Sequence, residues 1–224
     1  MIFLWVILYG VIYTLAERVS QAMHMTQSIT AFAMLMYILL FILWIYKTGQ
    51  RRKIGLNIIH PFGFRECWTL CPLIVFPLYN FWVGRECLIS LPTMIIVLSL
   101  SVSEELFFRG FMLHFFVRWG NLSSILITST IFALFHFVNI IKDNNVVYIL
   151  IQVLCAFFVG ICYSAVTIKY NSLLPCVVIH FLTNITGINT YVQNRNIGEM
   201  SGVYLCMMVH AIYGVYLFKK CNNY

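Results

Sequence analysis

Residues 98–114 read Leu-Ser-Leu-Ser-Val-Ser-Glu-Glu-Leu-Phe-Phe-Arg-Gly-Phe-Met-Leu-His, and this stretch decides how the chain folds. It lies within an apolar run over residues 88–117. That run is longer than the roughly 20 residues that a helix needs to cross a bilayer. Glu104, Glu105 and Arg109 interrupt it, and each ionised side chain at mid-membrane costs on the order of 2.5–3.5 kcal/mol. Three such groups in one span indicate either a function or a role in holding a helix bundle together.

The apolar character extends over the whole chain. Of its 224 residues, 62% are hydrophobic and only 21 are charged, 14 Lys or Arg and 7 Asp or Glu. A soluble domain of this length would carry roughly 56 charged residues. The composition therefore excludes a cytosolic enzyme, a disordered chain and a secreted disulfide-bonded scaffold. We expect an all-α fold, a polytopic bundle of transmembrane helices, because hydrocarbon leaves backbone polar groups to satisfy one another.

Eight apolar runs have the composition of membrane helices, and seven spans are the alternative because the first and third runs are short. The runs cover residues 1–16, 29–46, 68–83, 88–117, 122–141, 146–168, 173–191 and 201–218. Residues 47–66 form a polar loop, and we expect part of it to lie at the interface as a short amphipathic helix.

The basic residues indicate the orientation of the bundle. With eight spans, nine Lys and Arg residues lie in loops on one side and four on the other, with Arg109 in neither set. The positive-inside rule then places the N- and C-termini in the cytoplasm. The net charge of +7 does not predict a nucleic-acid partner, because the longest basic cluster, Arg51-Arg52-Lys53, is typical of a cytoplasmic loop next to membrane lipid. The eight Cys residues show no C-x-x-C spacing and are predicted to be buried apolar side chains.

Helical spacing separates the two adjacent carboxylates. Glu105 and Arg109 are four residues apart, so they share one helix face and can form an ion pair. Glu104 lies about 100° around the helix from Glu105. This spacing predicts one carboxylate with a structural role and one that is available for chemistry.

Two other spans carry polar side chains. His136 lies in the fifth span, and His180 and Asn184 lie four residues apart on one face of the seventh. Counted from the boundary at residues 118–121, Glu104 and His136 are 14 and 15 residues deep, roughly 21–22 Å. His180 and Asn184 lie roughly 10–17 Å deep when counted from Leu173. Each residue alone is typical of packing or interhelical hydrogen bonding, but together they predict one polar cavity in the inner half of the membrane.

The polar residues form three motifs in a fixed order. Glu104-Glu105-Leu-Phe-Phe-Arg109 is an E-E-x-x-x-R motif, Phe132-Ala-Leu-Phe-His136 is F-x-x-x-H, and His180-Phe-Leu-Thr-Asn184 is H-x-x-x-N. This set resembles the signature motifs of the CPBP family of intramembrane proteases (CAAX protease and bacteriocin-processing, or Abi). The resemblance covers roughly residues 90–190. It implies a catalytic core over residues 88–191, flanked by N-terminal helices and a loop over 1–87 and by a last helix and tail over 192–224.

The resemblance implies an intramembrane endopeptidase that hydrolyses a peptide bond with an activated water. Glu104 is then the general base, and His136 helps to hold or polarise the water. His180 and Asn184 donate to the oxyanion, while Glu105 and Arg109 hold the fourth span in register. Family members act on prenylated proteins or are linked to bacterial peptide maturation and bacteriocin immunity. A peptide or lipidated protein substrate, a bacterial plasma membrane and a site open to the cytoplasm follow as expectations.

Two alternatives remain open at the level of sequence. Glu104, His136 and His180 are also suitable zinc ligands for a metal-dependent hydrolase, although no H-E-x-x-H spacing occurs and we favour a mechanism without a cofactor. The polar cluster is also compatible with a non-catalytic membrane protein of immunity, signalling or transport that uses it for binding.

Overall fold

The fold is entirely helical in the part of the chain that the computed structural model describes, residues 2–25, 27–50, 54, 70–83, 89–141, 145–193 and 201–221. The helices are α1 (Ile2–Ala22), α2 (Ser28–Lys47), α4 (Cys71–Val83), α5 (Leu91–Glu105), α6 (Leu113–Phe116), α7 (Asn121–Phe135), α8 (Val146–Tyr170), α9 (Leu174–Gln193) and α10 (Ser201–Cys221). A π-helical segment (Leu106–Met112) joins α5 to α6, and 3₁₀ segments follow α6 (Val117–Trp119) and α7 (His136–Ile141). Each of the eight predicted runs overlaps one continuous helical segment, which confirms the all-α class.

Several helices have the length and composition of membrane spans. Four are long and apolar enough to cross a bilayer: Ser28–Lys47, Leu91–Trp119, Asn121–Ile140 and Val146–Tyr170. Three further apolar helices are shorter: Cys71–Trp82, Leu174–Gly187 and Tyr204–Lys219. Large apolar side chains also point outward, for example Phe81 and Leu91, which are 74% and 69% exposed. Soluble proteins rarely expose so much apolar surface, so the chain is an integral membrane protein with several apolar helices.

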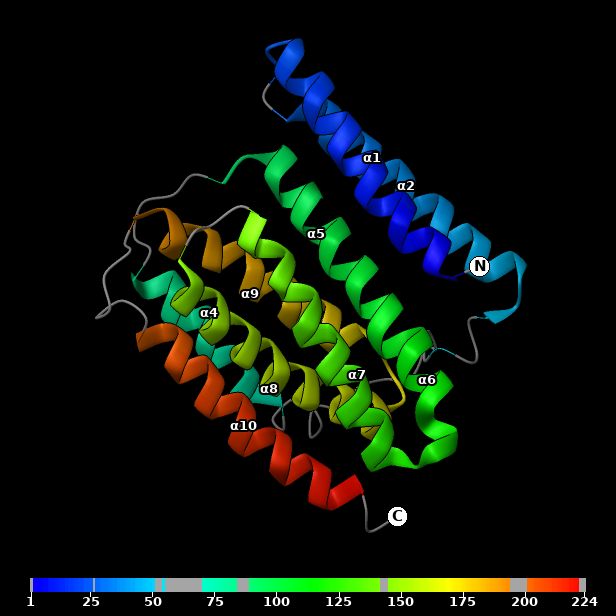
Figure 1. Cartoon of the computed structure of the whole chain (residues 1–224), viewed down its shortest axis with the longest axis vertical. Helices are drawn as coiled ribbons and strands as arrows, with labels where there is room; N and C mark the ends of the chain where they lie inside the picture. The colour runs from blue at the N-terminus through cyan, green and yellow to red at the C-terminus, as the bar shows by residue number, and fades with distance from the viewer. Residues whose placement is uncertain are drawn as a thin grey trace.

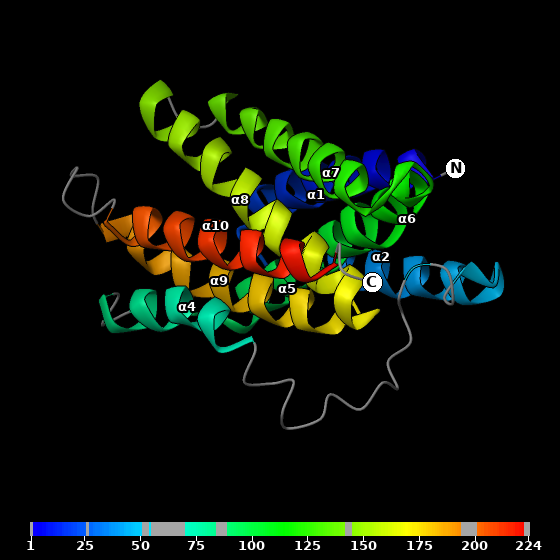
Figure 2. The ribbon, with the colours of Figure 1, turned by 90° about the horizontal axis from the view of Figure 1, so that it is seen from below.

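The helices form one bundle with α5 near its centre. Figure 1 shows α1 and α2 side by side at one edge, α5 beside α2, and α10 at the opposite edge. Figure 2 shows α7 and α8 running side by side, with α10 between α8 and α4. One apolar core joins α4, α8, α9 and α10, and a second joins α2 to α5 and the π-helical segment. Therefore α5 and the π-helical segment are covered from several sides.

A tight turn at Gly120 sets the direction of α7. The φ angle of Gly120 is 95°, a backbone conformation that favours glycine. Because the turn is so short, α7 runs back antiparallel beside α6 and the π-helical segment. At the other end, Ser90 caps α5: its Oγ accepts a hydrogen bond from Thr93 N at 3.3 Å. The two ends of this long segment are thus fixed by local sequence.

The helices α7 and α8 approach each other through small residues. A Cβ atom placed on Gly160 would lie 2.9 Å from Ser129 Cβ, so only a glycine fits opposite this serine. Ser129 donates to Ile125 O at 2.6 Å within its own helix. Membrane helices commonly pack through such small residues, which allow the backbones to come close. This contact fixes the helix that leads to His136.

Most of the predicted polar loop, residues 47–66, lies outside the described residues, and so does the segment in which we expect an amphipathic helix. The structure describes residues 47–50 and Ile54 of this loop. Ile54 is buried and lies against Gly110 in the π-helical segment. The loop therefore touches the bundle at the level of the π-helical segment.

Candidate active site

A chain of close polar contacts joins α5, the π-helical segment and α9. Arg109 Nη1 donates to Glu105 Oε1 at 2.8 Å, as the spacing of the two residues predicts. His180 Nδ1 donates to the same oxygen at 2.7 Å. On the other side of the imidazole ring, His180 Nε2 lies 3.7 Å from Glu104 Oε2. One buried histidine therefore lies between the two adjacent carboxylates.

The two carboxylates differ in their surroundings. The side chain of Glu105 is 0% exposed and shares one oxygen between two donors. The side chain of Glu104 is 28% exposed and has no contact shorter than that with His180 among the described residues. It also lies within electrostatic range of Tyr9 on α1. The geometry agrees with the prediction that one carboxylate is paired and the other is accessible.

Antiparallel packing of α9 against α5 brings His180 to this level. Leu173, just before α9, lies against Gly110. Asn184 Nδ2 donates to Ser101 Oγ at 3.4 Å. His180 falls between these two contacts, opposite residues 104–105. Leu173 is only 2% exposed, so the start of α9 is buried against the π-helical segment.

The helix changes its hydrogen-bonding pattern directly after Glu105. Residues Leu106–Met112 form a π-helix, and Arg109 is in its middle. Segments of π-helix are rare and frequently lie at functional sites. Nothing in the composition of this segment predicts it. The ion pair between Glu105 and Arg109 therefore spans the junction between α-helical and π-helical backbone.

Arg109 is stabilised by aromatic rings as well as by Glu105. Its Cζ lies 4.2 Å from the centroid of the Phe132 ring on α7 and 5.3 Å from that of Tyr163 on α8. Its Nε and Nη2 are buried and have no hydrogen-bond partner among the residues that the structure describes. A guanidinium in a dry site gains about 2 kcal/mol or more from a well-placed aromatic face. The sequence did not single out Tyr163, because a tyrosine in an apolar run gives no signal of its neighbours.

His136 lies on the other side of Phe132. Its ring centroid is 4.8 Å from that of Phe132, and its Nδ1 donates to Phe132 O at 3.0 Å. The Phe132 ring is in turn 6.2 Å from the ring of His180. Within the described residues, no hydrogen bond or ion pair joins His136 to Glu104 or His180. The structure thus brings Glu104 and His180 together, with Asn184 one turn further along α9. The ring of Phe132 contacts the rings of both His136 and His180 and separates the two histidines.

The alternative metal site can be compared with this geometry. Among the described residues, no group of three or more His, Cys, Asp or Glu side chains is placed to hold a metal ion. Glu104, His136 and His180, the three ligands considered from the sequence, are therefore not arranged as one ligand set.

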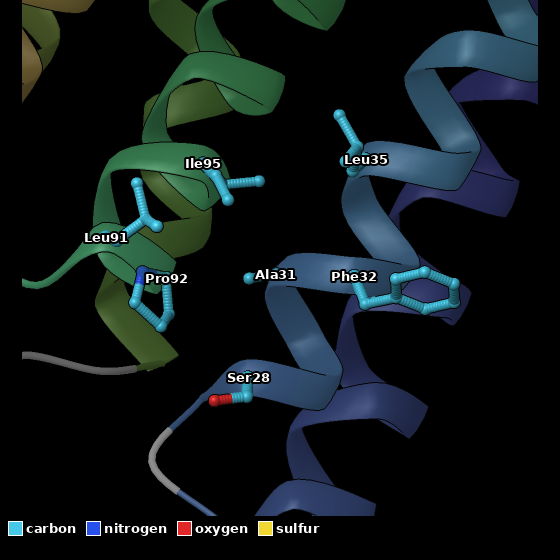
Figure 3. Close-up of a pocket in the computed structure, with 7 residues that line it drawn as sticks. All are labelled: Ser28, Ala31, Phe32, Leu35, Leu91, Pro92 and Ile95. Carbon is cyan, nitrogen blue, oxygen red and sulfur yellow. The ribbon is translucent and has the colours of Figure 1, made fainter.

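A cavity of about 220 Å³ lies between α2 and α5, away from this cluster. Figure 3 shows the residues that line it, which are Ser28, Ala31, Phe32, Leu35, Leu91, Pro92 and Ile95. Ile95 precedes Glu104 by nine residues on α5, roughly 13 Å along the helix. The lining is almost entirely apolar, and Ser28 is its one polar residue.

Comparison with known families gives one match. Residues 87–186 match the family described as type II CAAX prenyl endopeptidase, Rce1-like. No curated protein and no solved structure matches the chain. The matched segment contains all three motifs and every residue of the polar cluster except Tyr9. Residues 87–186 of the chain therefore belong to the Rce1-like type II CAAX prenyl endopeptidase family of hydrolases, as the resemblance of the three motifs predicted.

Proposed function

We propose that this protein is an intramembrane endopeptidase that hydrolyses a peptide bond in a membrane-associated or lipidated peptide or protein. One observation carries the proposal: His180 is buried between the paired Glu105 and the accessible Glu104. A structural ion pair needs only Glu105 and Arg109. The His180 imidazole also lies 3.7 Å from Glu104, which is partly exposed. The site therefore has a base, Glu104, next to a hydrogen-bond donor, His180.

In the proposed mechanism, Glu104 removes a proton from a water molecule, whose oxygen attacks the peptide carbonyl. The gap of 3.7 Å between Glu104 Oε2 and His180 Nε2 is short enough for one water to contact both groups. His180 Nε2 and the free N–H of Asn184 Nδ2 donate to the oxyanion. The protonated Glu104 then gives its proton to the leaving amine. His136, next to Phe132, polarises the incoming water or the carbonyl once the substrate is bound.

The Glu105–Arg109 pair has a positioning role in this mechanism. Because Glu105 Oε1 accepts from both Arg109 and His180, it fixes the His180 ring and keeps its Nδ1 protonated. The other nitrogen of the ring then faces Glu104 and the substrate. The pair itself does not touch the reacting atoms.

We further propose that residues 88–191 form the catalytic core, with residues 1–87 and 192–224 as flanking membrane segments. The distribution of nine basic residues against four supports eight spans with both termini in the cytoplasm. In this orientation the site is proposed to open to the cytoplasm, and Glu104 lies roughly 21 Å along its helix from the boundary at residues 118–121. A bacterial plasma membrane is the proposed location, because members of the family that the motifs resemble are linked to bacterial peptide maturation and bacteriocin immunity.

The proposal is tested with the purified protein in lipid vesicles. The substrates are a farnesylated peptide that ends in Cys-aliphatic-aliphatic-X, the same peptide without the lipid, and a bacterial leader peptide. Mass spectrometry measures the released C-terminal fragment. We expect cleavage by the natural protein and a loss of at least about 100-fold in Glu104→Gln.

Glu17→Gln is the matched control. Glu17 is a carboxylate on α1 that contacts Thr30 and Gln21, and it is not part of the cluster. Wild-type cleavage by a membrane-inserted Glu104→Gln protein would refute Glu104 as the base. Saturable binding of these peptides without any new termini would refute the endopeptidase and support a non-catalytic binding role.

A further inference from the structure

Tyr163, which lies outside the three motifs, is in contact with both ends of the Arg109–Glu105–His180 chain. Its ring centroid is 5.3 Å from Arg109 Cζ and 6.0 Å from the centroid of the His180 ring. It comes from α8, whereas Arg109 and His180 come from the π-helical segment and α9. Among the described residues, Phe132 is the other aromatic side chain that contacts both groups. Tyr163 and Phe132 therefore enclose the chain from two different helices.

Arg109 depends on these rings because its hydrogen bonding is incomplete. Within the part of the chain that the structure describes, Nη1 is the one guanidinium nitrogen with a hydrogen-bond partner, Glu105, while Nε and Nη2 are buried without one. A guanidinium with a single hydrogen bond can rotate about that bond unless its faces are held. The rings of Phe132 and Tyr163 hold it by packing and by cation–π attraction.

The hydroxyl of Tyr163 does not account for a tyrosine at this position. The residue is 0% exposed, and within the described part of the chain its hydroxyl has the Thr183 hydroxyl as a neighbour but makes no hydrogen bond of good geometry. A buried hydroxyl without a partner is unfavourable. The side of the ring that faces Arg109 and His180 is therefore the part of Tyr163 that matters for the site.

We infer that Tyr163 is a positioning residue for hydrolysis. Its ring fixes the Arg109 guanidinium and the His180 imidazole relative to each other, so that Glu105 Oε1 receives both donors at once and His180 Nε2 faces Glu104. Tyr163 acts through Arg109 and His180 and touches no reacting atom. This inference rests on the proposed endopeptidase function and adds a fourth helix, α8, to the elements that build the site.

The test compares Tyr163→Leu, Tyr163→Phe and a control in the vesicle cleavage assay. Tyr163→Leu removes the ring, and we expect kcat to fall by about 10- to 100-fold with KM within about twofold, because the catalytic groups lose their alignment while the substrate still binds. Tyr163→Phe keeps the ring, and we expect kcat within about threefold of wild type. Phe41→Leu is the control, because Phe41 is as buried as Tyr163 but contacts neither Arg109 nor His180.

A second measurement separates positioning from general packing. If Tyr163 acts through the guanidinium, Tyr163→Leu should reduce kcat by less than about threefold in a protein that already carries Arg109→Lys. Equal losses in both backgrounds, or a loss in Phe41→Leu as large as in Tyr163→Leu, would overturn the inference. So would a loss in Tyr163→Phe as large as in Tyr163→Leu. A wild-type protein that cleaves nothing would refute the proposed function instead, so the two failures are distinguishable.

Discussion

The same substitution at two adjacent positions should have opposite consequences. Glu105→Gln should destabilise the protein strongly, whereas Glu104→Gln should abolish cleavage and leave stability nearly unchanged. Both replace a carboxylate by an amide of the same shape, so each removes a charge and little else. The different results follow from the surroundings: Glu105 is fully buried and 2.8 Å from Arg109, whereas Glu104 is partly exposed and 3.7 Å from His180.

The loss of unfolding free energy in Glu105→Gln follows from the Arg109 charge that is left without its partner. In Glu105→Gln the amide oxygen can still accept from Arg109 and His180, but the guanidinium becomes a buried cation without an anion within 2.8 Å. Breaking a buried ion pair in this way costs about 3–5 kcal/mol. For a chain of this length, that corresponds to a fall in Tm of roughly 6–20 °C. For Glu104→Gln we expect a change below about 1 kcal/mol.

Thermal unfolding of the detergent-solubilised protein, followed by tryptophan fluorescence, measures the two changes, and the cleavage assay is run on the same samples. The double variant Glu105→Gln with Arg109→Met removes both charges and should recover part of the lost stability, because a buried pair replaced by apolar groups is close to neutral. A Glu105→Gln protein as stable as wild type would refute the buried pair. A double variant less stable than Glu105→Gln would refute the reasoning that the unpaired cation is the cause.

Three further changes follow from the described contacts. Gly160→Val should cost about 1–3 kcal/mol in unfolding free energy, because the new side chain meets Ser129; Gly10→Val, with no atom within 4 Å of its new Cβ, is the control and should match wild type within about 0.5 kcal/mol in the same assay. Asn184→Ala should lower kcat by about 100-fold with little change in KM, and a change confined to KM would contradict a role at the oxyanion. Tyr163→Phe should raise the unfolding free energy by up to about 1 kcal/mol, because it removes a buried hydroxyl that makes no hydrogen bond of good geometry among the described residues, and a lower Tm would show that its contact with Thr183 is stabilising.

The helices were predictable because their determinants are local. Membrane helices need long apolar runs, and the boundaries expected from composition differ from the described ones by a few residues, as at residues 68–83 against Cys71–Val83. The packing of α7 against α6 and the π-helical segment was also predictable, since the short turn at Gly120 makes α7 run back beside the helical segment that precedes it. The same turn is the basis for the prediction that Glu104 and His136 lie at similar depths in the membrane.

The contacts between distant helices were not predictable in the same way. The ion pair of Glu105 and Arg109 lies within one helical segment and follows from spacing, but its link to His180 depends on where α9 starts within the bundle. Leu173 is buried against Gly110, and nothing in the sequence around Leu173 indicates this contact. The π-helix after Glu105 depends on hydrogen-bond register rather than on composition. The contact of Tyr163 with Arg109 arises only when α8 packs against the π-helical segment.

The charges of the cluster explain how so many ionisable groups can share one membrane site. Arg109 and Glu105 cancel each other, so the state of the site depends on Glu104 and His180. If these two share one proton, the four groups have no net charge whether the proton lies on the carboxylate or on the imidazole. In the proposed mechanism His180 holds that proton at the start and donates to the oxyanion, while Glu104 is free to accept the proton of the water. A single proton therefore allows the base to be charged and the donor to be present at once, and burial of the cluster does not require an isolated charge.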